Sequence, residues 1–173
     1  MDPFARFAQT LLATQLRFVV IGVFGANYYA RSGGTIFTTQ DQDLFLPPDP
    51  ANLVRAWQAC DEASLSLWAG DEPLDIPRDL RLATAVVERR AGTTATGDEG
   101  LQVDLSLVMA GFDFDDVWAR RRSFKVDGVD IPVARLTDIV TSKANVGREK
   151  DRLFLATHEE ALRQLMGDDA AGD

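Results

Sequence analysis

Arg17-Phe-Val-Val-Ile-Gly22-Val-Phe-Gly-Ala-Asn-Tyr-Tyr-Ala-Arg31 is the stretch that organises the chain, together with Thr39-Gln-Asp41-Gln-Asp43-Leu-Phe-Leu46. A short apolar run that ends in glycine predicts a buried strand, a tight turn at Gly22 and a helix after it. The second stretch predicts another strand, and its two carboxylates share one face because side chains alternate along a strand. Two like charges this close are unfavourable without a cation between them, so the pair predicts a divalent metal with oxygen ligands.

The composition narrows the chemistry that such a site can perform. The chain has 173 residues, a net charge of −9, one histidine and one cysteine. A net negative charge argues against broad attachment to nucleic acid or to an anionic membrane. His158 and Cys60 cannot build a zinc site between them, and we expect His158 to be a surface residue. Catalysis would then depend on carboxylates, a lysine or arginine, and Mg²⁺ or Mn²⁺.

Targeting features are not evident in the sequence. No apolar run is long enough to cross a membrane, and the start of the sequence has no basic segment followed by an apolar run. We therefore expect a cytoplasmic protein.

Hydrophobic periodicity predicts an α/β (α+β) fold: a mixed sheet, flanking helices and a helical C-terminal part. We expect one domain over residues 1–166, with helices over 136–166, and a disordered acidic tail over 167–173. Asp127-Gly128 predicts a β-hairpin between 123–126 and 129–133. The other expected strands are 18–21, 38–46, 82–88 and 101–109; the expected helices are 3–15, 24–31, 50–63, 112–121, 135–146, 148–157 and 159–166; and 89–100 is expected to be a loop.

A third carboxylate, Asp104, lies on the polar side of the strand predicted over 101–109. If this strand neighbours the one that carries Asp41 and Asp43, three carboxylates meet at one end of the sheet. Such an arrangement suits metal-assisted phosphoryl transfer, with the third carboxylate binding metal or accepting a proton. Isolated aspartates on half-exposed strands are also simply solvated, and the pattern leaves that alternative open. At Gly22, backbone N–H groups at the start of a helix could hold a phosphate.

These pieces together resemble a known family. Gly22-Val23, Asp41-Gln-Asp43, Asp104 and the segment Lys143-Ala-Asn-Val-Gly-Arg148-Glu-Lys-Asp151 follow one another in the order seen in the nucleotidyltransferase (DNA polymerase beta) superfamily. The last segment is similar to a helix of small bacterial nucleotidyltransferases typified by the AbiEii toxins of type IV toxin–antitoxin systems. The resemblance covers residues 18–155.

The resemblance implies an activity and a role for each matching residue. The activity is transfer of a nucleoside monophosphate from a nucleoside triphosphate to a hydroxyl of RNA, a protein or a small molecule. Asp41, Asp43 and Asp104 would be catalytic and would bind Mg²⁺ or Mn²⁺. The nucleotide would lie against the remaining matching positions, Gly22, Val23, Lys143 and Asp151.

Two departures from the family support an alternative function. Val23 stands where the family has glycine or serine, and the spacing from Gly22 to Asp41 is long, with Ser32-Gly-Gly-Thr35 as the apparent excess. The alternative is a catalytically inactive member that binds a cognate partner protein in a toxin–antitoxin or defence system. By themselves, the charges from Lys143 to Asp151 could also be a solvated helix face with local ion pairs.

Overall fold

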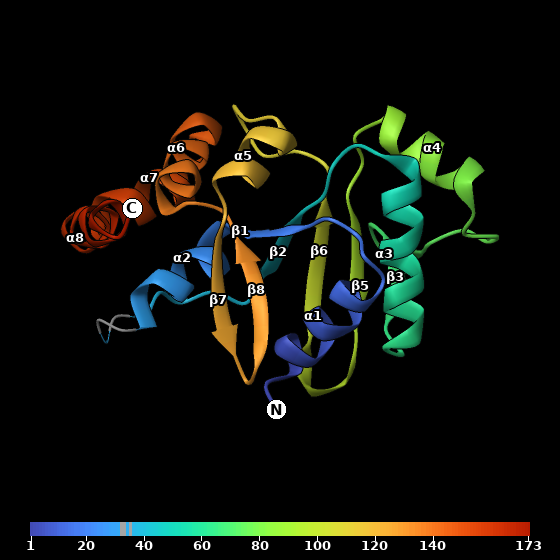
Figure 1. The fold of residues 1–173 in the computed structure, drawn as a ribbon. Helices are drawn as coiled ribbons and strands as arrows, with labels where there is room; N and C mark the ends of the chain where they lie inside the picture. Colours follow the sequence, from blue (N-terminus) through green and yellow to red (C-terminus); the bar gives the residue numbers. More distant parts are fainter. Residues whose placement is uncertain (32–33, 35) are drawn as a thin grey trace.

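The computed structural model describes residues 1–31, 34 and 36–173. Its described strands form an eight-stranded mixed sheet in the order β4-β3-β5-β6-β2-β1-β8-β7 (Figure 1). The strands are β1 Val19–Ile21, β2 Gln42–Phe45, β3 Ser66–Ala69, β4 Glu72–Pro73, β5 Thr93–Thr96, β6 Gln102–Ser106, β7 Arg122–Val126 and β8 Val129–Val133. The helices are α1 Pro3–Ala13, α2 Gly22–Ala30, α3 Pro50–Glu62, α4 Leu80–Glu88, α5 Phe114–Arg120, α6 Leu136–Val146, α7 Glu149–Thr157 and α8 Glu159–Ala171. The predicted α/β class, with flanking helices and a helical C-terminal part, is confirmed.

The centre of the sheet is formed by β1, β2 and β6. Strand β2 runs antiparallel to β1 and parallel to β6. In this register Asp43 lies opposite Ile21 on one side and opposite Asp104 on the other. The two carboxylates therefore come from neighbouring strands, which is the condition that the sequence left open for them to meet.

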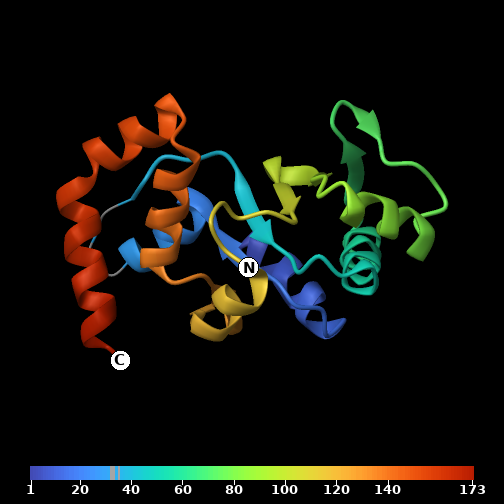
Figure 2. The ribbon, with the colours of Figure 1, turned by 90° about the horizontal axis from the view of Figure 1, so that it is seen from above.

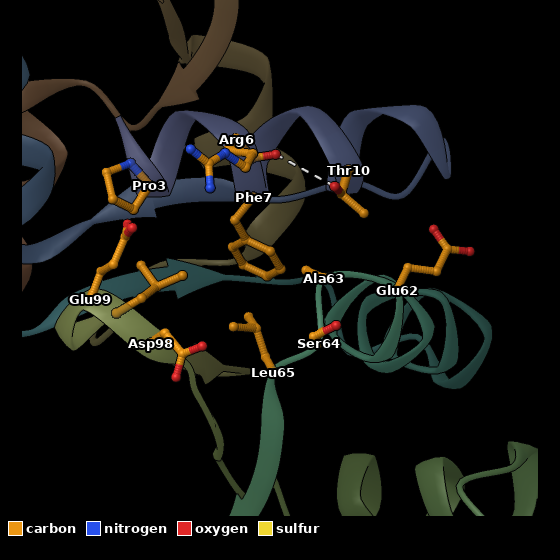
Figure 3. Close-up of a pocket in the computed structure, with 11 residues that line it drawn as sticks. Pro3, Arg6, Phe7, Thr10, Glu62, Ala63, Ser64, Leu65, Asp98 and Glu99 are labelled. Atoms are coloured by element: carbon orange, nitrogen blue, oxygen red, sulfur yellow. Dashed lines mark hydrogen bonds between the residues drawn. The ribbon is translucent and has the colours of Figure 1, made fainter. Parts of the chain in front are cut away.

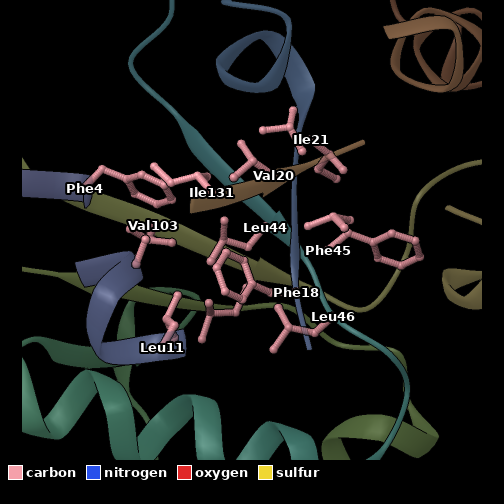
Figure 4. Close-up of a cluster of buried hydrophobic side chains, with 14 of the residues drawn as sticks. Phe4, Leu11, Phe18, Val20, Ile21, Leu44, Phe45, Leu46, Val103 and Ile131 are labelled. Atoms are coloured by element: carbon pink, nitrogen blue, oxygen red, sulfur yellow. The ribbon is translucent and has the colours of Figure 1, made fainter. Parts of the chain in front are cut away.

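One face of the sheet is closed by α1 and α3, as Figure 1 shows. Phe4 and Leu11 of α1 lie beside Leu44 and Val103 of the sheet in the buried cluster of Figure 4. Asp2 caps α1 by accepting a hydrogen bond from the Ala5 amide at 2.9 Å, and Pro3 occupies the first turn, where a missing N–H costs nothing. Each fully buried side chain of this size contributes about 1.5–3 kcal/mol through the area that it removes from water.

The C-terminal helices gather beside α2, away from α3 and α4 (Figure 2). Gly147 ends α6 in the left-handed region, with φ +65°, and its N–H bonds the Lys143 carbonyl at 3.0 Å. Glycine adopts this conformation without the steric penalty of a side chain, so the chain can turn sharply into α7. The interruption predicted at Gly147 is confirmed.

Two predicted elements are wrong. Residues 82–88, predicted as a strand, belong to α4, which Asp79 caps by accepting a hydrogen bond from the Leu82 amide at 3.1 Å. Part of the predicted loop over 89–100 is strand β5, which pairs with both β3 and β6. The short apolar run before Glu88 suits a helix or a strand equally, and in α4 the cap and the packing on α3 favour the helix. The apparent excess at Ser32-Gly-Gly-Thr35 lies mostly outside the described residues, since of these four only Gly34 belongs to them.

The acidic tail also differs from its prediction. Helix α8 continues to Ala171, and Asp169 accepts hydrogen bonds from Arg122 Nε at 2.9 Å and from Arg135 Nε at 2.8 Å. Its side chain is only 8% exposed. These ion pairs fasten α8 to β7 and to the start of α6, which a composition-based prediction of disorder cannot detect.

His158, predicted at the surface, is half-buried with its ring against Phe37 and Phe154. No helix in the described part of the chain is long and apolar enough to span a bilayer.

Replacing Asp169 by asparagine should lower the free energy of unfolding by about 2 kcal/mol, because two charge-assisted hydrogen bonds lose their acceptor charge. Urea denaturation followed by circular dichroism measures this change. Asp168→Asn is the matched control, because Asp168 is exposed on the same helix and should change stability by less than about 0.5 kcal/mol. Equal effects of the two substitutions would contradict a structural role for Asp169.

Candidate active site

The site begins where β1 turns directly into α2. Gly22 has φ +70°, and a Cβ placed on it would lie 2.6 Å from Asp43 Oδ2. Any side chain here would both strain the backbone and collide with the carboxylate. Only glycine therefore lets the Asp43 carboxylate approach the start of α2. Val23, the next residue, is partly buried and packs against the core.

Asp43 is paired with a second carboxylate across the sheet. Burial, the negative charge of Asp104 and a hydrogen bond with Asp104 together raise the pKa of Asp43 to about 7, and burial makes the largest contribution. The charge of Asp41 contributes a smaller increase, and that of Lys143 opposes it. A cation bound beside Asp43 would offset the negative charge that gathers there.

Asp104 is oriented by a residue that sequence reasoning missed. Thr94 on β5 lies directly opposite Asp104, and its Oγ1 donates a hydrogen bond to Asp104 Oδ1 at 3.1 Å. The sequence placed Thr94 in a loop, so nothing connected it to the site. The alternation of Thr93-Thr-Ala-Thr96 was the only signal that could have identified the strand.

Asp41 occupies a different position from the one predicted. Strand β2 begins at Gln42, so Asp41 precedes it and is exposed. Strand β1 pairs no farther than Asp43, because the chain leaves the sheet at Gly22. Among residues 1–31, 34 and 36–173, no group of three or more His, Cys, Asp or Glu side chains is arranged to hold a metal ion. The structure brings Asp43 and Asp104 together and leaves Asp41 close enough to influence Asp43 electrostatically.

Lys143 and Asp151 form a buried ion pair between α6 and α7. Lys143 Nζ lies 3.1 Å from Asp151 Oδ1, and Arg148 binds both oxygens of the same carboxylate, at 2.7 and 3.2 Å. The Asp151 side chain is 1% exposed. Hydrogen bonds from Arg148 and Lys143 lower the pKa of Asp151 to about 2 despite its burial, and the contribution of Arg148 is the largest. Lys143 is thus held rigidly, with its charge also acting on Asp43.

A cavity of about 420 Å³ lies elsewhere, between α1 and the end of α3 (Figure 3). Arg6 and Phe7 line one wall, and Glu62, Asp98 and Glu99 line the other. A second cavity, of about 510 Å³, lies among α2, β7 and α8. Neither contains any of the predicted site residues, so these two cavities do not contribute to the carboxylate site.

Comparisons with known proteins give little beyond the fold. No protein-family model matches this chain, and no curated protein matches it. Among solved structures, the solution structure of the antibiotic-resistance factor ANT(2'')-Ia is similar over 99% of this chain and 94% of that one, with 13% sequence identity and a TM-score of 0.49. Similarity at this level assigns neither an activity nor a substrate to this chain.

The raised pKa of Asp43 makes a testable contribution to stability. Because the folded protein holds a proton on this carboxyl that the unfolded chain releases near pH 4, stability falls as the pH rises from about 4 to about 7. Asp43→Asn cannot ionise, so its melting temperature relative to wild type should increase between pH 5 and pH 8. Thermal denaturation in EDTA measures this difference. A difference that stays constant or decreases with pH would contradict it, and Asp41→Asn should show a smaller increase.

Asp151→Asn should lower the free energy of unfolding by about 3–5 kcal/mol, because Lys143 is left buried beside a neutral amide. The lowered pKa means that the carboxylate stabilises the fold fully above about pH 4, and that this stabilisation is lost as the pH falls through about 2. Chemical denaturation at pH 7 measures the loss. Glu149→Gln, an exposed acid on the same helix, is the control and should be nearly neutral.

Proposed function

We propose that this chain is a metal-dependent nucleotidyltransferase, which moves a nucleoside monophosphate from a nucleoside triphosphate to a hydroxyl acceptor. The observation that supports this best is the packing of Asp43 against Gly22 on one side and Asp104 on the other. It places two carboxylates beside the start of α2, where backbone N–H groups point outward. The carboxylates that can bind a cation therefore lie beside backbone N–H groups that can donate hydrogen bonds to phosphates.

The carboxylates suit Mg²⁺ or Mn²⁺ chemically. Mg²⁺ is usually bound by one or two carboxylates together with substrate phosphates and water, not by a complete cage of protein ligands. Asp43 and Asp104 would hold the ion, and Asp41 would act on it only through its charge. When bound, the ion would offset the charge of the phosphates during transfer. The raised pKa of Asp43 supports this assignment, because burial first, and then the charges of Asp104 and Asp41, disfavour its ionised form, and a bound cation would offset that cost.

The phosphates would lie between α2 and α6. The N–H groups of Gly22 and Val23 belong to the first turn of α2, which has no side-chain cap. Val23 lacks the hydroxyl that a serine would have at this position. Its backbone N–H is unaffected by the side chain and still serves as a hydrogen-bond donor. Lys143, fixed by Asp151, would supply the positive charge opposite them. Asp151 is then a positioning residue.

In the proposed reaction, the acceptor oxygen attacks the α-phosphorus of the triphosphate. The bond between the α-phosphorus and its bridging oxygen to the β-phosphate breaks, and pyrophosphate leaves. Asp104 takes the proton from the acceptor hydroxyl, with its carboxylate oriented by Thr94.

The resemblance of the Lys143–Asp151 segment to the AbiEii toxins supports a role in a toxin–antitoxin system, and a triphosphate substrate would be available in the cytoplasm.

Isothermal titration calorimetry with each nucleoside triphosphate tests the proposal. Wild type should bind at least one triphosphate when Mg²⁺ is present and at least tenfold more weakly in EDTA. Asp104→Asn should reduce the rate of transfer by about 10²–10⁴-fold, when the rate is measured as release of pyrophosphate. Lys143→Ala should weaken triphosphate binding, whereas Lys150→Ala, an exposed lysine nearby, should not.

The controls separate the enzyme from the alternative. Asp116→Asn, an exposed acid on α5, should leave binding and transfer unchanged. If wild type binds none of the triphosphates, or if Asp43→Asn and Asp104→Asn bind and react as wild type does, the enzymatic proposal is wrong. A stable co-purifying partner without triphosphate binding would favour the inactive, partner-binding alternative.

A further inference from the structure

The two outermost strands of the sheet differ in how they present their free edges. Strand β4, at one end, has two residues, Glu72–Pro73. A short strand that contains proline, which has no N–H, pairs poorly with a further strand. Strand β7, at the other end, has five residues and no proline, and β8 is its one neighbour among the described strands (Figure 1). The β7 edge therefore offers the longer row of backbone groups.

The hairpin between β7 and β8 determines which of these groups point outwards. Its two-residue turn, 127–128, has φ of 49° and 83°, which is typical of a type I′ turn. The hydrogen bond across such a turn joins Val126 and Val129, which lie opposite each other. Hydrogen-bonded and non-hydrogen-bonded pairs alternate along an antiparallel ladder. Ser123 and Lys125 therefore belong to non-hydrogen-bonded pairs, and their N–H and C=O groups point away from β8.

Two further observations agree with this arrangement. Pro132 lies opposite Ser123, and without an N–H it could not complete a hydrogen-bonded pair there. Ser123 and Lys125 are both exposed. Within residues 1–31, 34 and 36–173, no backbone group outside the strands bonds to either of them. Their outward N–H and C=O groups can therefore pair with another strand.

The cavity of about 510 Å³ borders this edge. All five residues of β7 line it, although their side chains alternate between the two faces of the strand. A cavity that reaches residues of both faces lies beside the strand, which is where an added strand would be placed. Helix α2 contributes Tyr28 and Arg31 to its walls, and α8 contributes Leu165 and Asp168.

One side of an added strand would meet apolar side chains. Phe124 projects towards α2, and its ring centroid lies 5.7 Å from that of Tyr28 and 4.9 Å from that of Tyr29. Leu165 of α8 lines the same cavity. Residues opposite each other in paired strands share a face, so a side chain opposite Phe124 would project towards this apolar wall. A β-branched apolar residue suits that position.

The charges along the edge favour an acidic residue opposite Lys125. Arg122 is already bound by Asp169 at 2.9 Å, so these two charges offset each other. Lys125 pairs with Asp130 at 2.9 Å, but their side chains are 66% and 63% exposed, and ion pairs this exposed are weak. Lys125 can therefore interact with a carboxylate on an added strand.

The walls of the cavity add to this preference. The Arg31 guanidinium lies 4.4 Å from the centroid of the Tyr28 ring. With Lys125 it gives the cavity two cations, against the exposed acid Asp168. A second copy of β7 would bring the same two cations to both sides of an interface, and like charges placed opposite each other are unfavourable. An acidic segment complements this edge better than a second copy does.

We propose that the β7 edge binds an extended segment of another protein as an additional antiparallel strand. The segment alternates apolar and acidic residues, with an apolar residue opposite Phe124 and an acidic one opposite Lys125. Main-chain hydrogen bonds with Ser123 and Lys125 supply affinity, and the alternating side chains supply specificity. Strand β8 separates β7 from the strands of the carboxylate site, so binding here is independent of the proposed function.

Fluorescence anisotropy with the full chain and a labelled hexapeptide, three repeats of Val-Glu, tests this. Because Lys125 points its backbone groups outwards, the glutamate opposite it forms a hydrogen-bonded pair, and the valines point their N–H groups away from β7. N-methylation of the glutamates should therefore weaken binding at least tenfold. N-methylation of the valines gives an isomer of the same charge and should change the affinity less than threefold.

Side-chain variants test the charge preference. A hexapeptide of three Val-Lys repeats should bind at least tenfold more weakly than the Val-Glu peptide. Lys125→Glu should weaken binding of the Val-Glu peptide at least fivefold, whereas Lys150→Glu, at an exposed lysine on α7, should leave it unchanged. Native-state hydrogen exchange gives the location: the bound peptide should slow exchange of the Ser123 and Lys125 amides at least tenfold.

Four outcomes would overturn the proposal. The first three are no binding of the Val-Glu peptide at about 1 mM, equal effects of the two N-methylated isomers, and unchanged binding to Lys125→Glu. The fourth is a dimer of the chain, measured by sedimentation, in which the Ser123 and Lys125 amides are protected without peptide. A second copy would then occupy the edge in place of another protein.

Discussion

The approach of the Asp43 carboxylate to the bare Cα of Gly22 is the constraint on which the site depends. It requires β1 to end where α2 begins, and it requires β2 to pair with β1 so that Asp43 lies opposite Ile21. Pairing of β2 with β6 then brings Asp104 to the other side of the same carboxylate. Each step follows from the one before it, so the turn at Gly22 determines where the charged residues meet.

Two half-buried or buried carboxylates in this chain are stabilised in opposite ways. Asp151 is surrounded by Arg148 and Lys143, and its pKa falls to about 2. Burial and the charges of Asp104 and Asp41 raise the pKa of Asp43 to about 7, with Lys143 as the main opposing charge. Asp151 therefore needs nothing from outside the protein. Asp43 carries an electrostatic penalty that a bound cation would remove, which is typical of a functional site rather than a structural one.

Sequence reasoning succeeded where a local feature determines the structure. Gly22, Asp127-Gly128 and Gly147 each mark a turn whose positive φ favours glycine, and the elements beside them were predicted correctly. It failed where pairing or packing decides. Residues 82–88 suit a strand until Asp79 caps them as a helix on α3, and Thr93–Thr96 becomes a strand only because β3 and β6 lie on both sides of it.

The candidate site shows the same division. Asp43, Asp104, Lys143 and Asp151 could be proposed from type and order along the chain, whereas Thr94 belongs to the site only through cross-strand register. The alternation of side chains predicted that Asp41 lies in a strand. A strand needs a neighbouring strand to pair with, and the pairing of β2 with β1 ends at Asp43, because the chain turns from β1 into α2 before it reaches the level of Asp41.

Lys143 connects the two charge clusters and explains why neither neutralises the other. Its ammonium group lies 3.1 Å from Asp151 and its side chain is 15% exposed, so its position is set by α7 and not by the sheet. Since Asp151 also binds Arg148 through both oxygens, Lys143 shares its partner and retains part of its charge for the side facing Asp43. Held by Asp151, Lys143 lies where its charge acts on Asp43, and the proposed metal-bound nucleoside triphosphate would carry both a cation for Asp43 and phosphates for Lys143.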